Sequence, residues 1–172
     1  MEGSRGQVTF RLPYPVKVDT FSIDHVAREI IPKDMQESTP KHLRVIGYPP
    51  CPEGEDCSAL GFDASDPMEI AQINYDATGT TIQTFDSVWT QAAKFAPQDE
   101  EDDDDDDDDD GGGGGYLEAE DEPSSCSKET ASCSTPPRMD VAGITVKVLE
   151  NWGAPEYTCL YRFRVHGEPV FS

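Results

Sequence analysis

Nine consecutive aspartates, Asp102–Asp110, followed by five glycines, Gly111–Gly115, interrupt the chain and decide how the rest can be organised. Adjacent carboxylates repel one another, and glycine loses more conformational entropy on ordering than other residues. We therefore expect residues 98–137 to be a disordered acidic, Gly- and Ser-rich insertion. Two more specific hypotheses for the function of this segment are a low-affinity calcium buffer and a docking tail for a basic partner. A homopolymer supplies charge for both, without the ligand placement of a built calcium site.

The acidic excess lies mostly in this segment. Residues 98–137 hold 17 of the 35 acidic residues and one basic residue, Lys128. The rest of the chain therefore has 18 acidic and 12 basic residues and a net charge of −6. About 130 residues are left, enough for one hydrophobic core. The overall charge of −22 excludes nucleic-acid binding by bulk electrostatics. No apolar run approaches the roughly 20 residues of a membrane span, and no signal-peptide stretch starts the chain. The chain is either a soluble cytosolic protein or a piece of a longer one.

Short segments with a period of two occur on both sides of the insertion, which predicts an all-β fold, a β-sandwich. The expected strands are 7–12, 16–26, 42–48, 69–75, 82–85, 141–150 and 157–165. Helix is scarce: Val26–Ile31 predicts one turn that Pro32 stops. The last two strands are too few to fold alone, so they must pair with the first part. Residues 1–172 then form a single domain that carries the insertion.

No catalytic constellation is present in the sequence. The histidines are His25, His42 and His166, and neither a GxSxG nor an HExxH motif accompanies them. The glycine run lacks the following Lys-Ser/Thr of a phosphate-binding loop. We expect no enzyme activity and no cofactor.

Five cysteines have spacings that do not fit a zinc site. Cys51 and Cys57 bracket the acidic loop PEGED, and a local disulfide between them is possible in an oxidising compartment. Cys126 and Cys133 lie in the insertion. Cys159 is either a small buried apolar residue or half of a disulfide whose partner is missing.

The C-terminal run Asn151–Pro169, NWGAPEYTCLYRFRVHGEP, closely resembles the end of the SUN domain. Earlier segments agree in order: GSRG before the strand VTFRL, FSIDH at 21–25, STPKHLRVIG at 38–47, and NYD with IQTF at 74–85. The resemblance spans about residues 3–169 without the insertion. It implies a galactose-binding-like jelly-roll sandwich.

A complete SUN domain starts well upstream of Gly3, so the resemblance identifies this chain as an N-terminally truncated, partial SUN domain. The missing part of the family pattern holds a coiled coil, a hairpin lid, most of a cation-binding loop and a cysteine. Cys159 resembles the family cysteine that pairs with that upstream residue, and we expect it to be unpaired. We expect no metal in this chain. A monovalent cation in the complete domain would draw on the backbone carbonyl of Tyr161. Membrane association would come only from an upstream transmembrane segment.

The resemblance also implies a partner. SUN domains form homotrimers in the perinuclear space at the inner nuclear membrane and bind the C-terminal tail of KASH proteins, and this LINC complex bridges nucleoskeleton and cytoskeleton. A terminal carboxylate needs hydroxyl or N–H donors in a partly desolvated pocket. The family's pocket positions fall on Gly6, His25, Ser38, Tyr157 and Tyr161.

An alternative from another class is a carbohydrate- or ligand-binding sandwich of the discoidin type. It would require exposed aromatic side chains at loop tips, for which Trp89 and Phe95 are the candidates. A peptide with a free C-terminus, compared with an extended one, separates the two readings.

Overall fold

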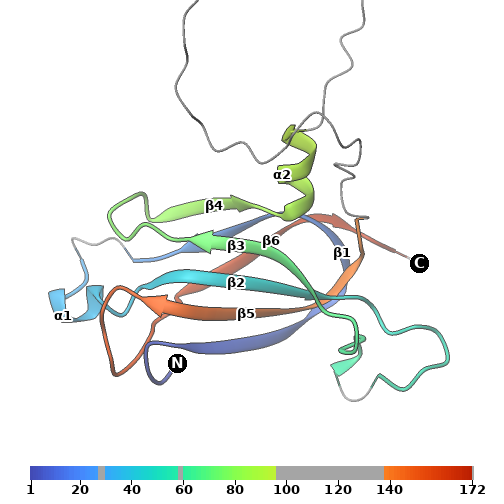
Figure 1. Cartoon of the computed structure of the whole chain (residues 1–172), viewed down its shortest axis with the longest axis horizontal. Helices are drawn as coiled ribbons and strands as arrows, with labels where there is room; N and C mark the ends of the chain where they lie inside the picture. Colours follow the sequence, from blue (N-terminus) through green and yellow to red (C-terminus); the bar gives the residue numbers. More distant parts are fainter. Residues whose placement is uncertain (27–29, 58–59, 96–137, 172) are drawn as a thin grey trace, which may run out of the picture.

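The computed structural model describes residues 1–26, 30–57, 60–95 and 138–171. Six strands and two helices occur in these residues (Figure 1). The elements are β1 (Gly6–Asp24), α1 (Lys33–Gln36), β2 (Pro40–Tyr48), β3 (Met68–Asn74), β4 (Ile82–Asp86), α2 (Val88–Phe95), β5 (Val141–Asn151) and β6 (Arg162–Pro169). The insertion predicted at 98–137 lies outside the described residues.

All the strand pairs are antiparallel, and β1 belongs to both layers of the resulting sandwich. Its first half pairs with β5, which continues through β2 to β3. Its second half lies between β4 and β6. The register shifts between Arg11 and Val16, where Pro13 and Pro15 cannot donate to a ladder. The predicted all-β sandwich is therefore confirmed, and the two strands expected at 7–12 and 16–26 are one strand that changes layer.

The core lies between the two layers. Phe21 and Ile23 of β1 are fully buried, and they face buried aliphatic side chains of the opposite sheet. Phe163 of β6 packs its ring 5.5 Å from that of Phe21. The buried residues of the opposite sheet are Leu43, Val45, Ile70, Ile73, Ile144, Val146 and Val148.

The last predicted strand is wrong in its first half. The structure starts β6 at Arg162, and Tyr157–Tyr161 form a loop whose one ladder contact is an isolated bridge between Tyr157 and Glu2. Their backbone groups bond elsewhere: Thr158 N–H donates to Met1 O (2.9 Å) and Cys159 N–H to Ser38 O (2.8 Å). The alternation continues through this segment, but within the described residues no strand forms a ladder with it.

The structure contains two helices that the sequence did not predict. Helix α1 begins directly after Pro32, which is its N-cap residue. Residues 27–29 of the predicted turn lie outside the described residues. Helix α2 was not predicted; its Trp89 is 4% exposed and belongs to the core, so its assignment to an exposed loop tip was wrong. Among the described residues, no helix is long and apolar enough to cross a membrane.

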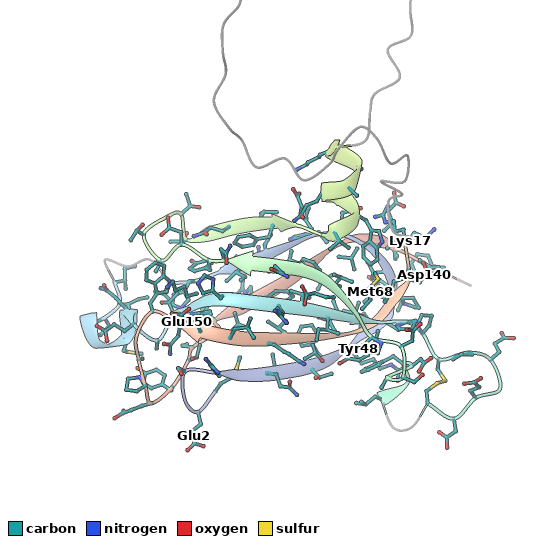
Figure 2. The ribbon with its side chains drawn as sticks, in the orientation of Figure 1. Glu2, Lys17, Tyr48, Met68, Asp140 and Glu150 are labelled. Atoms are coloured by element: carbon teal, nitrogen blue, oxygen red, sulfur yellow. A yellow bond between two sulfur atoms is a disulfide. The ribbon has the colours of Figure 1, made fainter. Side chains whose placement is uncertain are left out.

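The ends of the sandwich differ. Cys51 and Cys57 are joined by a disulfide in the β2–β3 connection, at the end opposite α1 (Figure 2). Helix α2 and Arg138 flank the insertion, and both contact Asp19 of β1. Thr90 Oγ1 donates to Asp19 O (2.7 Å), and the guanidinium of Arg138 pairs with the Asp19 carboxylate. The chain thus leaves and re-enters the sandwich at nearly one point.

Candidate functional site

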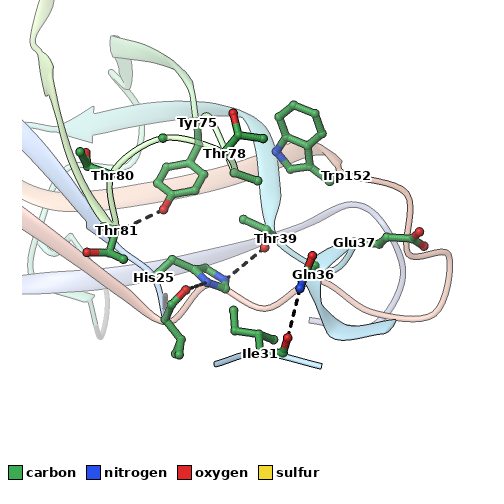
Figure 3. A pocket seen from close by; sticks show the side chains of 13 residues that line it. His25, Ile31, Gln36, Glu37, Thr39, Tyr75, Thr78, Thr80, Thr81 and Trp152 are labelled. Atoms are coloured by element: carbon green, nitrogen blue, oxygen red, sulfur yellow. Dashed lines mark hydrogen bonds between the residues drawn. The ribbon is translucent and has the colours of Figure 1, made fainter. Parts of the chain in front are cut away.

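A pocket of about 880 Å³ opens at the α1 end of the sandwich, between the β3–β4 turn and the loop that follows β5 (Figure 3). Its volume is within the range of about 300–1,000 Å³ that is usual for small-molecule sites. The lining residues used below are His25, Thr39, Tyr75, Thr78, Thr81 and Trp152.

The β3–β4 turn forms one wall and is held by two side chains. Asp76 Oδ1 accepts from the N–H (2.8 Å) and the hydroxyl (2.7 Å) of Thr78. Gln83 Nε2 donates to Asp76 O (2.6 Å) and Thr80 O (3.0 Å), while its Oε1 accepts from Asp76 N–H (3.1 Å). These five short hydrogen bonds fix the turn in one conformation.

The loop after β5 forms the other wall, and Asn151 holds it. Asn151 is 4% exposed, and its Nδ2 donates to Ala154 O (2.7 Å), Thr158 Oγ1 (3.0 Å) and Tyr157 O (3.3 Å). Trp152 N–H donates to Thr39 O (3.1 Å), and Gly153 follows with φ of +130°, which favours glycine. Trp152 is 40% exposed, and Lys41 Nζ lies 5.3 Å from the centroid of its ring.

The polar side chains at the bottom of the pocket, those of His25, Thr39 and Tyr75, make long hydrogen bonds. His25 Nε2 lies 3.5 Å from Thr39 Oγ1, its Nδ1 lies 3.4 Å from Val26 O, and Tyr75 OH lies 3.5 Å from Thr81 O. These distances exceed the 2.7–3.2 Å typical of a well-formed bond. Burial raises the pKa of Tyr75, and the carboxylates of Asp76 and Asp24 raise it further. Tyr75 therefore stays neutral well above physiological pH.

Ser38 is the most buried of the predicted peptide-binding residues. It is 1% exposed, its hydroxyl donates to Met35 O (2.7 Å), and its carbonyl accepts from Cys159 N–H. The hydroxyl is therefore engaged within the chain. The hydroxyl can donate a hydrogen bond to a ligand carboxylate only after the Ser38 side chain adopts another rotamer.

The two tyrosines do not share a strand face as the period of two predicted. Tyr157 is half-buried beside Glu2, while Tyr161 is 60% exposed, with the Arg162 guanidinium 6.0 Å from its ring centroid. Leu160, from the opposite set of the alternation, is the residue that packs on the core.

Gly6 lies at the start of β1 in the same neighbourhood. A Cβ atom at Gly6 would lie 2.8 Å from Met1 Sδ, and Met1 exchanges backbone hydrogen bonds with Thr158. Cys159 is a free, half-buried thiol in this loop. Within the described ranges, no group of three His, Cys, Asp or Glu side chains is arranged to hold a metal ion.

Ser38 and Gly6 thus adjoin the loop that carries Tyr157 and Tyr161, Ser38 through its carbonyl and Gly6 through Met1, whereas His25 lies next to Thr39. Reasoning from the sequence missed Trp152 and Tyr75 as lining residues of a pocket and Asn151 as the support of one wall. The turn sequence Asn-Trp-Gly directly after an apolar strand was the available signal for an exposed tryptophan.

The comparison that decides the family is a match to the family model described as "Sad1 / UNC-like C-terminal", over residues 1–96 and 121–169. This chain belongs to the SUN-domain family. The unmatched residues 97–120 contain the aspartate and glycine runs, so the segment without a family counterpart is shorter than the insertion expected at 98–137.

Several curated relatives carry the SUN domain in their names. SUN domain-containing protein 3 of Bos taurus is 28% identical over 167 residues, covering 97% of this chain and 31% of that protein. SUN domain-containing protein 2 of Mus musculus is 26% identical over 98% of this chain and 15% of its own length. SUN domain-containing protein 1 of Homo sapiens is 27% identical over 98% of this chain and 14% of its length. This SUN domain therefore spans less than a third of these relatives.

Proposed function

We propose that this SUN domain is a binding module, not an enzyme, that holds the C-terminal tail of a KASH protein. In this role it works as a homotrimer in the perinuclear space, attached to the inner nuclear membrane, and it links nucleoskeleton to cytoskeleton in a LINC complex. Family membership supports the module, and the arrangement of the α1 end supports the peptide site.

One observation carries the proposal. The hydrogen bond from Cys159 N–H to Ser38 O (2.8 Å) holds the loop with Tyr157 and Tyr161 against the segment that contains Ser38. A hydrogen bond between segments that are far apart in sequence therefore brings the Ser38 backbone next to the loop that carries both tyrosines. Hydroxyl donors converging in a half-buried place are what a peptide carboxylate requires.

The residues have separate roles in this proposal. The exposed hydroxyl of Tyr161 and that of Tyr157 donate to the carboxylate, and Ser38 adds a third donor when it leaves Met35 O. His25 lines the approach, and at Gly6 the peptide comes close to the backbone once the Met1 side chain, which fills the space beside Gly6, moves aside. Exposed apolar side chains at this end, Val26, Ile30 and Met35, suit contact with a neighbouring protomer or a longer peptide.

Calorimetry with a peptide ending in Pro-Pro-Pro-Thr tests the proposal. The chain is presented as a trimer on a coiled coil, together with the upstream lid of a relative. Binding should require the free terminus, so one added C-terminal residue should abolish it. Tyr161→Phe should weaken binding by about 5- to 150-fold, the equivalent of 1–3 kcal/mol for a hydrogen bond to a charged group. Tyr14→Phe, at the opposite end of the sandwich, is the matched control.

The isolated 172-residue chain should show no measurable binding at micromolar concentration, because avidity and lid burial are then lost. Tight binding by the isolated chain would contradict the requirement for the lid and the trimer. Equal binding of the free and the extended peptide would contradict carboxylate recognition itself.

A further inference from the structure

Asp24, the last residue of β1, is a buried carboxylate that two arginines share unequally. It is 8% exposed, and its Oδ2 atom lies 2.7 Å from a guanidinium nitrogen of Arg164 and 3.4 Å from one of Arg162. The shorter distance is that of a charge-assisted hydrogen bond, whereas the longer one exceeds a well-formed bond. Arg164 is therefore the main counterion of Asp24, and Arg162 makes the weaker contact.

The cluster has one positive charge in excess, because two guanidinium groups face one carboxylate. The second carboxylate oxygen, Asp24 Oδ1, is buried and has no hydrogen-bond partner among the described residues, so it does not hold Arg162 either. The Arg162 side chain is 53% exposed. A half-exposed ion pair with one long contact contributes little to stability. Arg162 can therefore exchange this contact for an incoming anion while Arg164 keeps the buried charge of Asp24 compensated.

Arg162 stands at the edge of the proposed peptide site. It is the first residue of β6 and follows Tyr161 directly, and its guanidinium carbon lies 6.0 Å from the centroid of the Tyr161 ring. Tyr161 is 60% exposed, so a phenol hydroxyl and a cation are both accessible on neighbouring side chains. Arginine and tyrosine together supply the charge and the hydrogen-bond donors that a carboxylate requires.

The rest of the loop lacks this charge and carries the opposite one. Its proposed donors are neutral hydroxyls, and Tyr157 lies between two exposed acidic residues, Glu156 before it in the chain and Glu2 across the isolated bridge. These carboxylates disfavour an anionic ligand unless a nearby cation offsets them. An arginine can do so with two parallel N–H···O bonds, each stronger than a bond between neutral groups.

We propose that Arg162 is the cationic contact of the peptide site and takes the terminal carboxylate of the bound tail, beside the Tyr161 hydroxyl, while Arg164 retains Asp24. The inference rests on the peptide-binding function proposed above. It adds the residue that makes the site select a charged terminus over a neutral one.

A double-mutant cycle tests the contact on the full 172-residue chain, presented as the coiled-coil trimer with the upstream lid. The ligand is a peptide that ends in Pro-Pro-Pro-Thr and has no acidic side chain, either as the free acid or as the C-terminal amide. Arg162→Gln should weaken binding of the free acid about tenfold or more in calorimetry. It should change binding of the amide by less than about twofold, because the amide offers Arg162 no charge.

Arg44→Gln is the matched control. Arg44 of β2 is also a half-exposed arginine, at 50%, with one long ion pair of 3.5 Å to Glu69, and its removal changes the net charge by the same amount. It should leave the binding of both peptides unchanged. Arg162→Lys keeps the charge without the planar fork, so it should lose less affinity for the free acid than Arg162→Gln. A merely structural role of Arg162 would weaken binding of the acid and the amide alike.

N-acetylthreonine and its amide give a second measurement on the isolated 172-residue chain, which needs neither trimer nor lid. At millimolar concentration the acid should shift the NMR signal of the Arg162 Nε–Hε group, which is assigned from its loss in Arg162→Gln. The Arg44 signal should stay in place, and the amide should shift neither. A shift of Arg162 by the acid, in a chain whose trimer binds no peptide, would support the carboxylate contact and contradict the peptide function.

Three results overturn the role of Arg162. They are an equal loss of acid and amide binding in Arg162→Gln, an unchanged affinity of that variant for the free acid, and an Arg162 signal that N-acetylthreonine does not move. Binding of the free acid that responds to Tyr161→Phe but not to Arg162→Gln would keep the peptide function and remove only Arg162 from its site.

Discussion

Strand β5 and the loop at 152–161 are neighbours in the chain and differ completely in structure. Both contain alternating apolar and polar residues, and the sequence predicted strand in β5 and in Tyr157–Tyr161. Strand β5 lies between β1 and β2 and forms ladders with both. The loop instead bonds to Met1 and Ser38 and to its own Asn151. Alternation therefore describes which side chains are apolar, whereas a strand also requires a partner edge.

The difference predicts very unequal costs of truncation. Ile144 of β5 is fully buried, so Ile144→Ala should lower the free energy of unfolding by about 3–4 kcal/mol through lost burial and a cavity. Tyr161→Ala, with 60% of the residue exposed, should cost less than about 0.5 kcal/mol. Urea denaturation of both variants measures this. Similar losses would mean that the loop is packed like a strand.

Asn151 is the point at which β5 becomes loop, and its removal should rank second. Asn151→Ala leaves the Ala154 carbonyl and the Thr158 hydroxyl without their buried donor, which should cost about 2–3 kcal/mol. Asn74→Ala removes an exposed amide and is the control, with an expected loss below about 1 kcal/mol. If the two variants unfold at the same urea concentration, the loop is not held by Asn151.

The pH dependence of stability should single out Tyr75. Its raised pKa means that its contribution is fully present below the unfolded pKa of about 10 and is lost as pH rises through the folded pKa. Wild-type stability should therefore fall above about pH 10. Tyr75→Phe keeps the ring and should make the alkaline fall shallower, as measured by urea midpoints across that range. An unchanged slope would show that Tyr75 does not titrate with folding.

Removal of residues 99–137 should have the smallest effect. Both flanks of this segment contact Asp19, so a short Gly-Ser bridge can join them, and we predict a change within about 1 kcal/mol. Thermal unfolding of the deleted chain measures it, with a Gly-Ser insertion of equal length as the control. Collapse of the fold in the deleted chain, but not in the control, would show that the segment bridges its flanks structurally.

Much of the fold could be predicted because apolar residues repeat with a period of two along the chain. Val146 and Val148 in β5, and Phe21 and Ile23 in β1, follow the period that the pleat requires, and all four are buried. Helix α2 was missed because it is only eight residues long and follows a strand directly. Its Trp89 is decided by the space between the layers, which local sequence does not describe.

The peptide-binding residues could be named only through the family resemblance, and they remain a prediction. Tyr157 and Tyr161 were correctly placed in one segment, but not on one strand face. Ser38 was expected to offer a hydroxyl that the structure shows bonded to Met35 O. Such local competition for a hydroxyl depends on the turn that α1 makes, and no spacing rule reveals it.

The sequence by itself determined the fold class, the family and the place of the acidic insertion, because apolar period, motif and charge are local properties of the chain. Only the tertiary structure decided where β1 changes layer, that residues 157–161 pair with the described part of the chain only through the bridge at Tyr157, and that Trp152 lines the same pocket as His25 and Tyr75. These features depend on which segments meet in space. Pairing and enclosure are long-range outcomes of closing the sandwich, and residue pattern alone leaves them open.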